Sequence, residues 1–296
     1  MNHWSAAVLL RVTLIGFCLF ASGLPFGNAQ GMEPEDSSSI SEELPDAPSA
    51  MRQESSSQHA SHTPDLAKER KGPSNMFGLP KQIIQDQIGF FKSPAAIRTR
   101  DLKWIIPVAA ATGAALASDT YTMRNVVSRD KDVTNMSARV SDVMRYSFLG
   151  GPTLMVFLGR AGKNEHFHSA GLLGMEAFGD AYLVSTLFKF TSYRERPFLN
   201  DARGHFFSAD AGANSSFPSG HSMTAFAAAT VLAEEYPTFW KQAALYSLAT
   251  GVGVTRIIGE RHFPSDVLIG SVGGWMIGHY VHKVHHRYRD LDTGKH

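Results

Sequence analysis

Six apolar segments dominate the chain from about residue 104 onward and limit the folds open to it. They are rich in Ala, Gly, Leu and Val, and they lack the alternation of apolar and polar residues that is typical of a half-buried β-strand. The segments are 104–118, 146–159, 169–188, 220–233, 242–254 and 265–281. The sequence therefore predicts an all-α protein built as a six-helix bundle.

Small residues and acidic residues within these segments indicate how the helices would pack. Four glycines recur at helical spacing in the last segment, at positions 270, 273, 274 and 278, and would let that helix approach a neighbour closely. Glu176 and Asp180 lie one turn apart in the third segment. A carboxylate facing lipid is costly, so this pair is expected to face the interior of the bundle or a polar cavity.

Residues 1–29 have the features of a secretory signal. Arg11 precedes an apolar run, and the small residues Gly27 and Ala29 suit cleavage. An uncleaved N-terminal anchor helix is the alternative. The only cysteine of the chain, Cys18, lies in this segment, so a mature chain would hold no disulfide and no Cys-ligated metal.

The rest of the chain divides by composition. Residues 30–75 are rich in Ser, Glu, Gln and Pro and are expected to form a disordered linker, because they offer too little apolar surface to bury. Residues 76–102 carry apolar side chains at helical spacing, which predicts an amphipathic helix that lies on a membrane surface or packs on the core. Residues 103–285 form the helical domain, and residues 286–296 form a basic tail.

Two locations fit this pattern. Aromatic residues at Trp104 and Tyr280 and the basic tail favour a bundle embedded in the inner membrane. The apolar segments are short for spanning, since a bilayer core needs about 20 apolar residues. A basic tail inside the cell and six spans would also place residues 30–100 inside, whereas a cleaved signal would place them outside. A soluble periplasmic bundle is therefore the alternative.

Three polar motifs in the last third of the chain point to phosphate chemistry. They read Lys189-x6-Arg196-Pro197, Pro218-Ser219-Gly220-His221 and Arg256-x5-His262-x3-Asp266. A phosphoryl group in transfer carries charge on its equatorial oxygens, so a site that transfers it needs clustered cations. It also needs a nucleophile and a proton donor, and imidazole serves as either near neutral pH.

Each motif residue has an expected role. Lys189, Arg196 and Arg256 would form a cationic cage around the phosphate. Ser219 and Gly220 would open the fourth helix, where free N–H groups bind anions. The remaining expectation concerns His262, which would attack phosphorus to give a phosphohistidine, while Asp266 accepts a hydrogen bond from its other ring nitrogen.

The order and spacing of the motifs resemble the type 2 phosphatidic acid phosphatase and vanadium haloperoxidase superfamily, over roughly residues 100 to 285. The family pattern is matched throughout, except that Thr255 stands where the family has Ser before the third-motif arginine. The resemblance implies the fold of the acid phosphatases and haloperoxidases, with His221 as the proton donor to the leaving group. The motifs lie at helix ends that would meet on one side of the bundle, opposite the basic tail, so the active site is expected to face the periplasm or the exterior.

The expected substrate is a phosphorylated lipid, such as phosphatidate or a polyprenyl diphosphate, or else a small phosphoester. A soluble non-specific acid phosphatase, a vanadate-dependent haloperoxidase and a non-catalytic membrane scaffold are the alternatives. A net charge of +1 without a basic, aromatic-rich cluster argues against nucleic acid. No cofactor or metal is expected. Five histidines off the motifs are interpreted as a basic interfacial patch, namely His166, His168, His282, His285 and His286.

Overall fold

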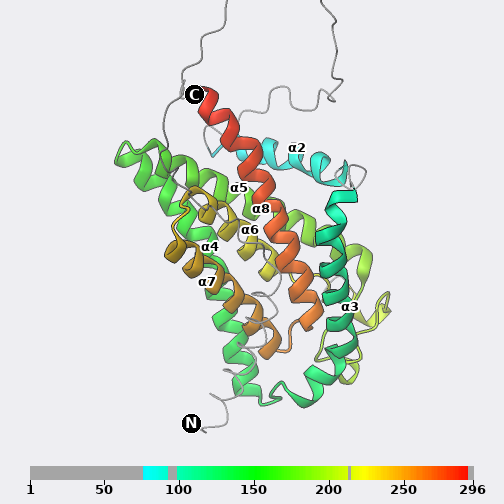
Figure 1. Ribbon diagram of the computed structural model, residues 1–296. Coiled ribbons are helices and arrows are strands. Elements are labelled where there is room, and N and C mark those ends of the chain that lie inside the picture. Colours follow the sequence, from blue (N-terminus) through cyan, green and yellow to red (C-terminus); the bar gives the residue numbers. More distant parts are fainter. Residues whose placement is uncertain (1–75, 93–98, 213–214, 293–296) are drawn as a thin grey trace, which may run out of the picture. The chain divides into compact units, whose positions relative to one another are not determined.

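The computed structural model describes residues 76–92, 99–212 and 215–292 (Figure 1). The expectations for a signal and a linker in residues 1–75 lie outside the described residues. Within them there are seven α-helices and no strand, which confirms the all-α class. The helices are α2 (Leu79–Lys92), α3 (Leu102–Asn125), α4 (Lys131–Ala161), α5 (Glu165–Ser192), α6 (Gly220–Glu235), α7 (Phe239–Ile258) and α8 (Pro264–Asp292).

Each of the six apolar segments lies within one of the helices α3 to α8, and α2 is the additional helix. The helices are longer than the apolar segments. α4 begins at Lys131, capped by the side chain of Asp130, and α8 continues through the predicted basic tail as far as Asp292. The difference arises because charged, solvent-facing turns extend a helix without adding apolar residues. No helix in the described part of the chain combines the length and apolar character needed to cross a membrane.

Helix α6 lies at the centre of the bundle, between α5, α7 and α8 (Figure 1). Most of its side chains are small and buried. One core cluster joins Leu173 and Ala181 of α5 to Met223 and Val231 of α6 and to Val281 of α8. A helix that is apolar all round in this way is a core helix, and it holds the surrounding helix ends in register.

Glycines on α8 allow it to lie directly against α6, as the sequence predicted. A Cβ atom at Gly270 would lie 2.5 Å from the carbonyl oxygen of Ser219, and one at Gly274 would overlap the carbonyl oxygen of Met223. No side chain fits at such a distance. The close approach places the start of α8 beside the start of α6.

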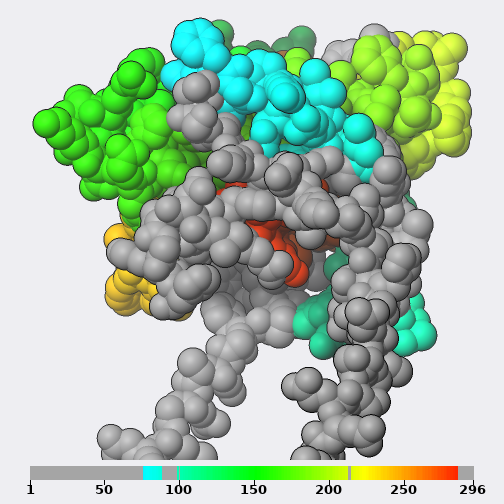
Figure 2. Space-filling model, turned by 90° about the horizontal axis from the view of Figure 1, so that it is seen from above, coloured from blue at the N-terminus to red at the C-terminus, as the bar shows by residue number. Residues whose placement is uncertain are grey.

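Helix α2 packs on the outside of the bundle (Figure 2). Its residue Leu79 joins an apolar cluster with Val156 of α4 and Leu172 of α5. The next inward positions are polar, because Gln82 and Asp86 are buried while Ile84 and Ile88 are 64% and 51% exposed. This helix therefore turns a polar face inward.

Candidate active site

The structure brings the three motifs together at helix ends. Lys189 lies in the last turn of α5, Arg196 in the segment before α6, His221 in the first turn of α6 and Arg256 in the last turn of α7. His262 lies just before α8, whose first residue is Pro264. These positions agree with the sequence prediction. Proline suits the first helical position because its missing N–H would have no partner there.

His262 is buried, with 1% of its surface exposed. Its Nδ1 lies 2.7 Å from the backbone oxygen of Ser216. A carbonyl oxygen only accepts hydrogen bonds, so Nδ1 carries the hydrogen and Nε2 carries the lone pair. That Nε2 is buried without a hydrogen-bond partner among the described residues. A buried nitrogen lone pair with no partner is what a nucleophile requires before its substrate arrives.

Burial lowers the pKa of the His262 imidazole well below its ordinary value, and the nearby cations of Arg196, Lys189 and Arg256 lower it further. The ring is therefore neutral at physiological pH. Lys189 and Arg196 belong to the first motif and Arg256 to the third, so these cations show that the two motifs converge on the His262 ring, as the sequence predicted.

Asp266 does not accept a hydrogen bond from His262, and the sequence prediction is wrong on this point. Its Oδ2 lies 3.8 Å from the His262 Nδ1, which is beyond hydrogen-bond distance. The carboxylate instead accepts from the Ser216 hydroxyl at 2.5 Å, from the Phe263 N–H at 2.8 Å and from the Arg194 guanidinium. Ser216 lies between the two residues because its carbonyl binds the ring and its hydroxyl binds the carboxylate. Asp266 therefore orients His262 through Ser216.

Arg194 lies between Lys189 and Arg196 without belonging to the first motif, and it is a buried structural residue. Only 3% of it is exposed. Its Nη2 donates to Asp119 of α3 at 2.7 Å, and its Nη1 donates to Asp266 at 2.5 Å. The ring of Phe263 lies against the guanidinium, with the centroid 4.3 Å from Cζ. Arg194 thus ties α3 to the start of α8. Burial raises the pKa of Asp266, and the guanidinium of Arg194 opposes this rise.

The three cations of the motifs are crowded and partly desolvated. Burial, followed by the neighbouring cations Arg196 and Arg256, lowers the pKa of Lys189 to about 8. Burial also lowers the pKa of Arg196 and of Arg256 to about 10. The Arg256 Nε is buried without a hydrogen-bond partner among the described residues. Cations that destabilise one another in a small buried space are stabilised by an anion, so this arrangement is suited to phosphate.

His221 has a carboxylate partner that the sequence did not reveal. Its Nε2 lies 2.7 Å from Oδ1 of Asp142 on α4, and the same oxygen accepts from Arg256 Nη1 at 3.1 Å. Burial and the cations of Arg256, Arg145 and Lys189 lower the pKa of His221, so the ring is neutral without an anion. Asp142 belongs to no motif, and it precedes the apolar segment of its helix.

Ser219 and Gly220 shape the start of α6. The buried Ser219 hydroxyl caps the helix by accepting from the Ser222 N–H at 3.4 Å. A Cβ at Gly220 would lie 3.1 Å from the Ser185 hydroxyl and 3.9 Å from Cε of Lys189, so glycine lets the start of α6 lie close to the end of α5. The capping function is observed, whereas a contact of Ser219 with phosphate remains a prediction.

The histidines off the motifs do not form the expected basic patch in the described structure. His285 is buried, with Nδ1 3.0 Å from Glu176. His282 lies 2.8 Å from Glu234, and His166 lies 2.9 Å from Glu235. The prediction failed because these carboxylates come from α5 and from the end of α6, far away in sequence.

Residues 169–290 match the model of the PAP2 superfamily, a range that contains all three motifs. This part of the chain is therefore similar to the PAP2 superfamily. Helices α2, α3 and α4 lie outside the matched range, so Asp119 and Asp142 are contributed to the site by a part of the chain that the family model does not cover.

Two relatives carry the same name. The chain is 44% identical over 71 residues to a lipid A 1-phosphatase of Porphyromonas gingivalis, which is 23% of this chain and 16% of that protein. It is 38% identical over 119 residues to a lipid A 1-phosphatase of Rhizobium etli, which is 40% of this chain and 37% of that protein. The chain thus spans well under half the length of these curated relatives. No solved structure matches it.

Proposed function

We propose that this protein is a phosphatase that hydrolyses a phosphomonoester or pyrophosphate on a lipid through a phosphohistidine at Nε2 of His262. One observation carries the proposal: this buried nitrogen has a lone pair and no partner, and it lies near three cations. A nucleophile next to a cationic anion site is the constellation that phosphoryl transfer requires.

In the first step, the Nε2 lone pair attacks phosphorus and the bond from phosphorus to the leaving oxygen breaks. His221 takes up a proton from solvent when the phosphate binds, and it gives this proton to that oxygen. Asp142 holds the His221 ring, and the negative charge of the bound phosphate offsets the cations that depress its pKa. The Ser216 carbonyl keeps the Nδ1 proton in place while positive charge develops on the His262 ring.

In the second step, water attacks phosphorus and the bond to Nε2 breaks. The neutral His221 takes the proton of the water, and inorganic phosphate leaves. Throughout, Lys189, Arg196 and Arg256 stabilise the equatorial oxygens, together with the backbone N–H group of Gly220 at the start of α6. The chemistry of this step needs no metal, because the positive charge comes from side chains.

The apolar surface around the site supports a lipid substrate. Large apolar side chains are exposed on α5 and on the segment that follows it, namely Tyr182, Leu187, Phe188, Phe190, Phe198 and Phe207. Exposed apolar patches of this kind mark surfaces that bind membranes or acyl chains. Both relatives are named for lipid A, so the substrate class includes lipid A 1-phosphate alongside phosphatidate and polyprenyl diphosphates.

Phosphate release in detergent micelles tests this function. Lipid A 1-phosphate, phosphatidate and the soluble ester p-nitrophenyl phosphate are compared at equal concentration. We expect the highest kcat/KM for a lipid substrate, and none for the His262→Ala variant. The His279→Ala variant is the matched control, because its ring is bound to Glu234 of α6, about four turns along α8 from the site. Equal turnover of the soluble ester would favour a non-specific phosphatase, and activity in His262→Ala would contradict the mechanism.

We also propose that the bundle is embedded in the inner membrane with the site facing the periplasm. Phe207, beside the site, is 79% exposed, and Glu165 lies at the opposite end of α5. In intact spheroplasts, an impermeant thiol reagent should label the Phe207→Cys variant and leave the Glu165→Cys variant unlabelled. Labelling of Glu165→Cys alone would place the site in the cytoplasm. Labelling of both would favour a soluble periplasmic protein.

A further inference from the structure

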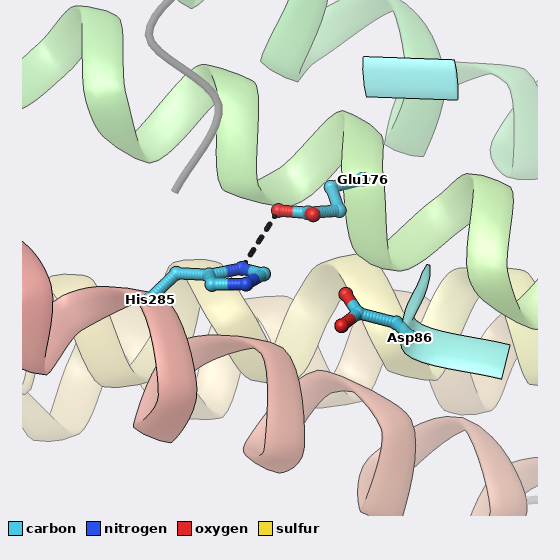
Figure 3. A group of neighbouring side chains, drawn as sticks. All are labelled: Asp86, Glu176 and His285. Carbon is cyan, nitrogen blue, oxygen red and sulfur yellow. Dashed lines mark hydrogen bonds and ion pairs between the residues drawn. The ribbon is translucent and has the colours of Figure 1, made fainter. Parts of the chain in front are cut away.

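A second cluster of buried polar side chains lies far from the phosphate site. It consists of Asp86 on α2, Glu176 on α5 and His285 on α8, whose side chains converge in Figure 3. Glu176 precedes Lys189 on α5, and His285 follows Asp266 on α8. At 1.5 Å per residue these separations are about 20 Å and about 28 Å. The cluster therefore makes no contact with the phosphate cage.

We propose that Asp86, Glu176 and His285 bind a divalent transition-metal ion, with Zn²⁺ as the best fit, and that the ion fastens α2 to α5 and α8. One ligand atom from each of the three residues lies within 4.8 Å of the other two. A zinc ion with bonds of about 2.0–2.2 Å needs its ligand atoms closer than this, so small side-chain rotations complete the site. The proposal is independent of the phosphatase function.

Glu176 and its neighbour Asp180 are bound to no arginine or lysine among the described residues. Glu176 is fully buried, and its Oε1 has no hydrogen-bond partner among the described residues. Asp180, one turn along α5, likewise has a buried Oδ2 without a partner, while its Oδ1 accepts from Gln87. None of the hydrogen bonds or ion pairs that the structure shows for these carboxylates comes from Arg or Lys. Buried carboxylates are ordinarily paired or bound to a metal.

At the phosphate site, by contrast, buried carboxylates are paired with an arginine. Its buried carboxylates Asp119 and Asp266 share the guanidinium of Arg194. The cluster around Glu176 has an imidazole in place of an arginine. An imidazole with two carboxylates is a donor set that favours Zn²⁺ over Mg²⁺ or Ca²⁺, because the two latter ions prefer oxygen ligands only.

A second residue of α2 supports the imidazole. The Gln82 side-chain amide lies 3.0 Å from Nε2 of His285, while Nδ1 faces Glu176 at 3.0 Å. When Nδ1 binds the metal, the ring hydrogen resides on Nε2 and donates to the amide oxygen of Gln82 after that amide rotates. Any protons on Asp86 and Glu176 are released to solvent. The polar inward face of α2 thus supplies one ligand and the support for another.

The test uses the purified full chain, stripped of metal and then given one equivalent of Zn²⁺. Elemental analysis after desalting should find about one zinc per wild-type chain and the melting temperature should rise by at least about 4 °C. The Asp86→Asn and Glu176→Gln variants should bind less than about a tenth as much zinc, and added Zn²⁺ should not shift their melting temperatures. Glu234→Gln is the matched control, because Glu234 binds His279 and His282 outside the cluster, and it should respond like the wild type.

A comparison without metal separates a metal site from a purely structural network. Glu176→Gln removes a buried carboxylate that has no cation, so the metal-free variant should melt no lower than the metal-free wild type. Phosphate release should stay within about twofold in this variant, because the cluster is remote from His262. Absence of zinc binding in the wild type, or equal binding by Glu176→Gln, would overturn the proposal. A lower melting temperature of the metal-free variant would do so as well.

Discussion

The two ends of the bundle bury titratable groups of opposite kind, bases at one end and acids at the other. At the end that holds the motifs, the cations Lys189, Arg196 and Arg256 gather around a neutral His262. At the other end, Glu176 is buried beside a histidine with no arginine or lysine bound to it in the described structure. Burying an unbalanced charge is costly in either case. The kind of group that is buried therefore supports the two proposals, an anion at the first end and a cation at the second.

The two buried histidines show how their partners assign them different functions. His262 donates to a neutral carbonyl, which fixes its tautomer and leaves Nε2 available for attack. His285 is held on both ring nitrogens, by Glu176 and by Gln82. A ring held in this way suits a metal ligand, whereas a ring with one free nitrogen suits a nucleophile.

The largest expected effect separates these two histidines. His262→Ala should lower kcat by at least about 10⁴-fold, because the covalent step is lost. His285→Ala should keep kcat within about threefold and lose zinc binding, because it lies far from the phosphate. Steady-state rates with a lipid phosphate substrate measure kcat, and elemental analysis measures the zinc content. Similar losses of activity in the two variants would abolish the distinction between the ends.

Removing Arg194 should have the next largest effect, and it should be on stability. Arg194→Met leaves Asp119 and Asp266 buried without their cation, which costs about 3–5 kcal/mol in the free energy of unfolding. Urea denaturation measures the change. Arg203→Met is the control, because Arg203 forms no ion pair with Asp119 or Asp266 in the structure. An equally small effect in both variants would show that Arg194 is dispensable.

Asp142→Asn should have a moderate effect on catalysis. The variant keeps the shape of the side chain and removes the charge that holds His221 and Arg256, so kcat should fall about 10–100-fold. Thermal stability should change little, because 49% of the Asp142 side chain is exposed. A normal rate in Asp142→Asn would remove this residue from the site.

The smallest effect concerns pH. Burial lowers the pKa of Lys189 to about 8, so its cation is present below that pH and is lost as the pH rises through it. The kcat/KM should therefore fall by about tenfold per pH unit above pH 8, since this ratio reports the free enzyme. Lys189→Arg should move the fall to higher pH, because a guanidinium remains charged. If the fall of kcat/KM above pH 8 is unchanged in Lys189→Arg, a group other than Lys189 causes it.

Much of the active end could be predicted because its signals are local. Ser219 precedes the helix it caps, Pro264 begins α8, and the motif spacings place Lys189 and Arg256 at helix ends. The i, i+4 spacing also brought Asp266 near His262, but the carbonyl of Ser216, 46 residues from His262, takes the hydrogen bond. Local spacing predicts proximity, and it cannot exclude a better partner from another part of the chain.

The opposite end was not predictable for the same reason. The bond between His285 and Glu176 joins residues 109 positions apart, and the contact between Gln82 and His285 joins residues 203 apart. Ile84 and Ile88 are among the apolar residues that recur at helical spacing in residues 76–102, yet the structure buries Asp86 and exposes both isoleucines. The contacts of α2 with the buried polar side chains of α5 and α8, and not its own amphipathic pattern, decide which face of α2 is buried.

The most direct test of the central claim is the position of the phosphoryl group on the enzyme. Wild-type protein is mixed with a ³²P-labelled lipid phosphate, quenched at alkaline pH within milliseconds and digested. The labelled peptide should contain His262, and the phosphate should be on Nε2, as told apart from Nδ1 by phosphorus NMR. The label should survive base and be lost in acid. A label on Nδ1, on a serine or on another histidine would contradict the assignment of His262 Nε2 as the nucleophile.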